Sequence, residues 1–143
     1  MKKSILTVIT ISGILLSCQK ETVKVEEKIC ELNAANLVGT YKIASIAYKK
    51  DSASATIDEF AAYEACKKDD LVTFNANNTI TFSDAGMVCN PNGNRTGKWT
   101  LSGDKIGVDS AVYNVLSFSC KNIKATYIGH TKGEISTVVL EKN

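Results

Sequence analysis

The stretch Leu71-Val72-Thr73-Phe74-Asn75-Ala76-Asn77-Asn78-Thr79-Ile80-Thr81-Phe82-Ser83 decides the fold class. On both sides of its centre, threonine alternates with large apolar residues, and a period of two is typical of β-strands with one buried face. The centre, residues 75–78, holds three asparagines, which tolerate the positive φ of a tight turn. The sequence therefore predicts a β-hairpin with strands at 71–74 and 79–83.

The same pattern recurs along the chain beyond this hairpin. Strands at 96–101 and 105–108 flank Ser102-Gly103-Asp104, which has the composition of a second hairpin turn. The remaining predicted strands are 40–48, 111–116, 121–128 and 135–141. Eight antiparallel strands joined mostly by hairpins most simply close into an up-and-down barrel, because closure removes both exposed edges. The predicted fold class is therefore all-β, with eight strands in one barrel.

One short helix is expected between the first and second strands. Thr56-Ile57-Asp58-Glu59 has the pattern of a capping box, with threonine three residues before a glutamate, and the apolar Phe60 and Tyr63 follow it. A structured loop without a helix is the alternative interpretation of these residues.

Alternation along the strands assigns an inward face to the barrel. An eight-stranded barrel is just wide enough to be filled by side chains or to hold one small molecule. The inward residues of the second to fifth strands are Val72, Phe74, Ile80, Phe82, Gly97, Trp99, Leu101, Ile106 and Val108. The candidate ligand-lining residues are Tyr41, Ile43, Phe74, Phe82, Trp99 and Tyr127. A lumen filled by these same aromatic side chains is the alternative.

The end of the barrel at which each cysteine lies follows from the alternation of the links between the two ends. In an up-and-down barrel, Cys66 in the first-to-second link and Cys89 in the third-to-fourth link lie at one end. Cys30, before the first strand, and Cys120, in the sixth-to-seventh link, lie at the other end. This topology predicts the disulfides Cys66–Cys89 and Cys30–Cys120, with four reduced thiols as the alternative. An open pocket would have its mouth at the end that bears the helix and Cys66.

The first 18 residues have the organisation of an export signal. Two lysines precede an apolar run, residues 5–16, which is shorter than the roughly 20 residues that a membrane-spanning helix needs. Leu15-Leu16-Ser17-Cys18 resembles a bacterial lipobox, in which the cysteine is diacylated and becomes the mature N-terminus. We therefore expect a signal peptide at 1–17, an acylated Cys18 with a charged tether at 18–32, and a barrel domain at 33–143. An ordinary secretory leader with a chance cysteine is the alternative.

Composition argues against several classes of function. Removal of residues 1–17 leaves 15 basic and 15 acidic residues, with Arg95 as the sole arginine, so the chain lacks the basic patch of a nucleic-acid-binding protein. His130 is the sole histidine and lies beside a glycine in a predicted turn, where a solvated side chain is expected. With the other cysteines assigned to disulfides, no metal site, cofactor site or nucleophile–base pair is expected, and the protein is predicted not to be an enzyme.

Several motifs together resemble the lipocalin-like lipoproteins of Bacteroidota. They are Leu37-Val38-Gly39-Thr40-Tyr41-Lys42-Ile43, Cys66-Lys67-Lys68-Asp69-Asp70, Asn77-Asn78-Thr79-Ile80-Thr81-Phe82 and Gly97-Lys98-Trp99-Thr100-Leu101. The resemblance covers roughly residues 33–143. It departs from the usual lipocalin pattern at Tyr41, where lipocalins have tryptophan, and in lacking an arginine near the final strand.

The lipobox-like motif together with this resemblance implies a location, and the open and filled alternatives for the lumen give two possible functions. The location is the cell envelope, with the protein anchored by lipid to the outer membrane, on its periplasmic or its outer surface. The first function is the binding of a small apolar ligand in the barrel. The second is that of a non-enzymatic interaction or scaffold subunit of a surface complex, with a filled barrel.

Overall fold

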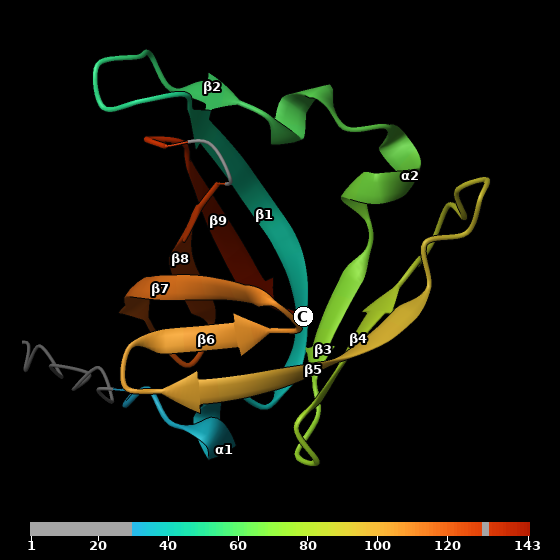
Figure 1. The fold of residues 1–143 in the computed structure, drawn as a ribbon. Helices are drawn as coiled ribbons and strands as arrows, with labels where there is room; N and C mark the ends of the chain where they lie inside the picture. The colour runs from blue at the N-terminus through green and yellow to red at the C-terminus, as the bar shows by residue number, and fades with distance from the viewer. Residues whose placement is uncertain (1–29, 130–131) are drawn as a thin grey trace, which may run out of the picture.

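In the computed structural model, which describes residues 30–129 and 132–143, eight strands close into an antiparallel barrel (Figure 1). The strands are β1 (Gly39–Lys49), β3 (Leu71–Phe74), β4 (Thr79–Ser83), β5 (Arg95–Ser102), β6 (Lys105–Val108), β7 (Ala111–Phe118), β8 (Asn122–Ile128) and β9 (Ile135–Lys142). Each pairs with the next, and β1 also pairs with β9, which closes the barrel. The predicted eight-stranded up-and-down barrel is confirmed.

Strand β1 makes closure possible because it pairs along both of its edges. Residues 39–42 pair with β3, and residues 41–49 pair with β9. A bulge between Ile43 and Ser45 shifts the register by one residue. Ile43 and Ile46, three positions apart, therefore both point into the barrel.

The link between β1 and β3 differs from its prediction. Residues Ile57–Asp58 form β2, which pairs with the end of β1, so they cannot serve as the first turn of a helix. The capping box does not form, and the Asp58 carboxylate instead accepts a hydrogen bond from the backbone N–H of Ala61 at 3.0 Å. The expected short helix is present as two separate turns, η1 (Phe60–Ala62) and α2 (Ala65–Lys68).

A short helix covers one end of the barrel. Helix α1 (Ala34–Leu37) begins after Asn33, whose side chain accepts the backbone N–H of Asn36 at 2.9 Å, as an N-cap residue does. Leu37 is completely buried, and its carbonyl accepts a hydrogen bond from the hydroxyl of Tyr41 at 2.9 Å. The end that bears α1, at the bottom of Figure 1, is called the closed end below.

Both predicted disulfides are confirmed. Cys30–Cys120 joins the segment before α1 to the β7–β8 link at the closed end. Cys66–Cys89 joins α2 to the β4–β5 link at the opposite end. The connectivity follows from the up-and-down topology, because links alternate between the two ends.

Packed aromatic residues close the lower end of the barrel. The ring of Phe74 lies edge-on to Tyr41 on one side and Trp99 on the other, with centroids 5.8 and 5.6 Å apart. Trp99 is 2% exposed, and its indole N–H donates to the backbone oxygen of Asn75 at 3.0 Å. These three rings, together with Leu37, form the floor of the barrel.

Three further predictions concern residues outside the described part of the chain. They are the signal peptide at 1–17, the acylated Cys18 and the solvated His130. Within the described residues, no helix has the length and apolar composition needed to span a membrane.

Candidate functional site

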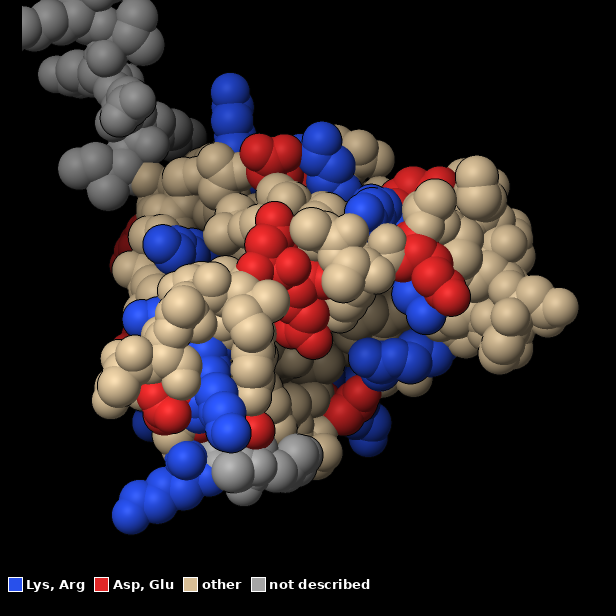
Figure 2. All heavy atoms as spheres, turned by 90° about the horizontal axis from the view of Figure 1, so that it is seen from above, with Lys and Arg blue, Asp and Glu red and all other residues tan. Residues whose placement is uncertain are grey.

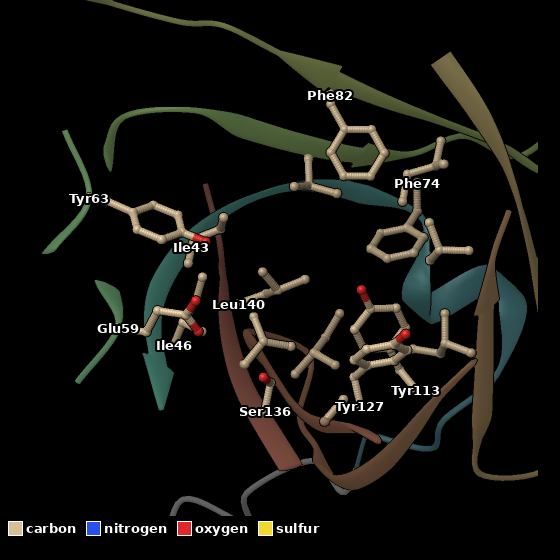
Figure 3. Close-up of a pocket in the computed structure, with 17 residues that line it drawn as sticks. Ile43, Ile46, Glu59, Tyr63, Phe74, Phe82, Tyr113, Tyr127, Ser136 and Leu140 are labelled. Atoms are coloured by element: carbon tan, nitrogen blue, oxygen red, sulfur yellow. The ribbon is translucent and has the colours of Figure 1, made fainter. Parts of the chain in front are cut away.

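Above the aromatic floor, the barrel encloses a cavity of about 360 Å³ (Figure 3). Its wall is formed by side chains from every barrel strand except β5, together with Glu59 and Tyr63 from the β1–β3 link. All of the lining residues apart from Glu59 and Ser136 are aliphatic or aromatic. A largely apolar cavity with a few polar groups, and a volume above about 300 Å³, is typical of a small-molecule site.

The structure separates the six candidate ligand-lining residues into two groups. Ile43, Phe74, Phe82 and Tyr127 lie in the cavity wall. Tyr41 and Trp99 also point inward, but they lie below the cavity, packed against Phe74 in the floor. The lumen is thus closed at its lower end, on the side of Tyr41 and Trp99, and open above these rings.

Strands β7 and β9 and the β1–β3 link contribute lining residues that were not among the candidates. They are Glu59, Tyr63, Tyr113, Ser136, Val138 and Leu140. The uniform apolarity of the last strands concealed which of their faces is inward, and a bulge between Val115 and Ser117 interrupts the alternation in β7. Glu59 and Tyr63 lie in the region predicted to be near the mouth, but no pattern shows that this link folds over the opening.

The mouth of the cavity lies at the end predicted from the link containing Cys66. The links β1–β3, β4–β5, β6–β7 and β8–β9 all meet there. Within the described chain, six of the seven exposed large apolar side chains lie on these links or at the adjoining strand ends. They are Ile57, Met87, Val88, Val112, Ile128 and Ile135. Figure 2 views this end and shows a hollow near its centre.

The polar groups of the cavity lie in its upper part. Glu59 and Tyr63 point into the opening from the link, and Tyr113 and Tyr127 lie opposite them on β7 and β8 (Figure 3). The Tyr113 and Tyr127 rings are tilted against each other with centroids 5.5 Å apart. Burial raises the pKa of the Tyr113 phenol. Burial, and then the charge of Glu59, raise the pKa of the Tyr63 phenol, so both hydroxyls stay protonated at neutral pH.

A cation beside the cavity is already paired. The Arg95 guanidinium carbon lies 3.5 Å from the centroid of the Phe82 ring, and its Nη1 donates to the Asp109 carboxylate at 3.1 Å. The second carboxylate oxygen of Asp109 accepts the backbone N–H of Lys98 at 2.9 Å. This carboxylate occupies the space beside Gly97, where any Cβ would collide with it. The glycine therefore makes room for the ion pair.

One group of potential metal ligands occurs in the described residues. It consists of Glu64, Cys66 and Cys89, within 4.8 Å of one another. The two sulfurs are bonded to each other, so they are not available as thiolate ligands.

Comparison with known proteins gives one result for the family and one for curated sequences. The family model for the lipocalin-like domain matches residues 37–129, from the end of α1 to just after β8. No curated protein sequence matches the chain.

Proposed function

The chain belongs to the lipocalin-like family, and on that premise we propose that it is a non-enzymatic binding protein that holds one small apolar ligand in its barrel. The observation that carries this proposal is the cavity of about 360 Å³ above the floor. Its wall is aliphatic and aromatic, so a ligand with an apolar body gains about 25 cal/mol for each Å² of its apolar surface that it buries there.

The arrangement of the mouth supports the same proposal. Exposed large apolar side chains are unusual when they cluster, and such clusters accompany ligand or partner sites. Here they lie on the links and strand ends at the open end of the barrel, outside the cavity wall itself, so that end presents apolar surface to an apolar ligand. The same cluster favours the second candidate function, that of a subunit whose rim binds another protein.

We also propose that the protein is an exported lipoprotein of the cell envelope, anchored at the outer membrane by acyl chains on Cys18. The lipobox-like sequence at 15–18 supports this, and two disulfides fit a compartment outside the cytoplasm. The chain enters the barrel at the closed end, where Cys30 is bonded to Cys120. A flexible tether of about 12 residues has a reach on the order of 20 Å, and it would be attached at the end opposite the mouth.

A fluorescence titration tests the binding function. N-phenyl-1-naphthylamine, a neutral apolar compound that brightens when it leaves water, should bind saturably with one site per protein. Ser136→Phe should abolish binding. Ser136 lies in the upper wall, paired with Tyr48 of β1 and Tyr127 of β8 on the neighbouring strands, and a phenyl ring there would occupy the cavity. Thr137→Phe is the matched control, since the neighbouring residue is absent from the cavity wall.

The two variants also separate the candidate functions. Saturable binding by the wild type and Thr137→Phe, but not by Ser136→Phe, supports a ligand in the barrel. Equal binding by all three folded proteins would place the compound outside the cavity, and the rim-docking function would then be favoured.

A further inference from the structure

The open end of the barrel is acidic although the chain as a whole is not. The four links that meet at the mouth are residues 50–70, 84–94, 109–110 and 129–134. Their described residues carry nine carboxylates and four lysines, a formal charge of −5, whereas the whole chain is formally +2. Figure 2 shows a group of acidic side chains at the centre of this face, beside the hollow. A field of one sign around a cleft attracts ligands of the opposite sign.

Glu59 brings one of these charges to the cavity itself. It is the one charged residue in the cavity wall, and its side chain makes no hydrogen bond or ion pair within the described part of the chain. Its backbone is fixed against β1, because the Glu59 N–H donates to the Ile46 carbonyl at 2.9 Å. The carboxylate is thus held at the mouth while remaining free to pair with a ligand.

One aromatic group beside Glu59 suits a cation. The Tyr63 ring lies next to Glu59 in the cavity wall, whereas the Phe82 ring is already covered by the Arg95 guanidinium. A cation over an aromatic face is attracted by the ring quadrupole. The Arg95 guanidinium, which could recognise an anion instead, lies outside the cavity wall, and its charge is offset by the Asp109 carboxylate at 3.1 Å.

We infer that the ligand is an apolar amine, with its hydrocarbon body in the barrel and its ammonium group at the Glu59 carboxylate. This inference rests on the proposed binding function and adds the chemical class of the head group. It distinguishes the site from one for fatty acids, whose head group carries the opposite charge.

Three compounds with the same tail test the inference. Decylamine, decanol and decanoate, each below its critical micelle concentration, are used to displace N-phenyl-1-naphthylamine from the folded protein at neutral pH. Decylamine should bind about fivefold or more tightly than decanoate, with decanol between them. This is the difference in affinity expected from one exposed or half-buried ion pair between the ammonium group and the Glu59 carboxylate. The preference should shrink at high salt because the charges at the mouth are then screened.

Two variants identify the residue responsible. Glu59→Gln keeps the shape of the side chain and should weaken decylamine about fivefold while leaving decanol within twofold. Glu64→Gln is the matched control, because it removes the same charge from the same link, where Glu64 is exposed and paired with Lys67 at 2.9 Å. It should leave decylamine within twofold. Circular dichroism and thermal melting verify that both variants are folded.

The outcomes separate this inference from the proposed function. If decanoate binds as tightly as decylamine, or if Glu59→Gln and Glu64→Gln behave alike, the inference about the head group is wrong and the binding function stands. If decanoate is preferred and the preference is lost in Arg95→Gln, the head group is an anion recognised by Arg95. If neither the dye nor any decyl compound binds, the proposed binding function itself fails.

Discussion

The indole N–H of Trp99 donates a hydrogen bond to the backbone oxygen of Asn75, 3.0 Å away, and so ties the middle of β5 to the end of β3. This bond holds the largest side chain of the barrel against Phe74 and below the cavity. The closure of the lumen beneath the cavity depends on that placement.

Replacement of Trp99 should be among the most destabilising single changes in the barrel. Trp99→Ala removes a side chain that is 2% exposed and leaves a void beside Phe74, so the free energy of unfolding should fall by about 3–5 kcal/mol. Denaturant titration measures this loss. Trp99 is also the sole tryptophan, and its emission should be blue-shifted and protected from quenchers in the folded protein. A water-exposed emission spectrum would contradict the floor described here.

The disulfides should contribute unequally to stability. The bridges Cys30–Cys120 and Cys66–Cys89 span sequence separations of 90 and 23 residues. In the chain-entropy model, loops of these lengths stabilise the folded state by about 5 and 3 kcal/mol, respectively. Unfolding of the two double-alanine variants should therefore show the larger loss for the longer loop. Peptide mapping without reduction verifies the pairing, and a peptide linking Cys30 to Cys66 would contradict the fold.

Asp70 should destabilise the folded protein at neutral pH. Its Oδ1 atom is buried without a hydrogen-bond partner, and burial, then the charge of Asp84, raise the pKa of the carboxyl group. Because the raised pKa favours the protonated form in the folded state, the penalty applies above that pKa and disappears as the pH falls through it. Asp70→Asn should therefore raise the Tm at pH 7 and have a smaller effect in acid.

The exposed Asp104, in a link at the closed end, provides the control for this prediction. Asp104→Asn should leave the Tm and its pH dependence close to those of the wild type. A lower Tm for Asp70→Asn at pH 7 would show that the charged form of Asp70 stabilises the fold, contrary to the burial argument.

Acylation at Cys18 should decide where the protein is found in the cell. Cys18→Ser should abolish incorporation of labelled palmitate and release the protein from the membrane fraction. Two acyl chains anchor a protein stably at about 0.8 kcal/mol per buried CH₂, whereas the formally neutral mature chain offers no other general attraction. The wild-type protein, with residues 1–143, is the reference. A Cys18→Ser protein that still sediments with membranes would exclude this anchor.

Local sequence predicted the strands well because each carries its own signal. Alternation and turn residues place 71–74, 79–83 and 105–108 with the same bounds as the structure. The disulfides followed in turn from the order of the links. In the β1–β3 link, however, pairing of Ile57–Asp58 with β1 replaced the helix start that local pattern favoured. That pairing depends on tertiary contacts, which no local pattern encodes.

The candidate site was predicted in part for the same reason. Alternation finds inward residues, so it correctly turned Phe74 and Phe82 toward the lumen. Alternation does not show how far along the barrel axis the packed side chains of the floor extend. That limit decides that Trp99 belongs to the floor and Phe82 to the cavity wall. Alternation also does not follow a bulge, such as the one between Ile43 and Ser45 that turns Ile46 inward. Glu59 lines the cavity because of the way the β1–β3 link folds, and alternation along the strands does not predict the fold of a link.

Native mass spectrometry of the protein purified from its own host tests whether the barrel holds a small molecule. The open upper barrel predicts a population with added mass, from one small molecule per chain, that is released by collisional activation. Ser136→Phe purified in the same way should show the mass of the protein alone, and Thr137→Phe should retain the adduct. If the wild-type protein carries no adduct from its host and none is acquired on adding apolar compounds, the barrel does not serve as a binding site.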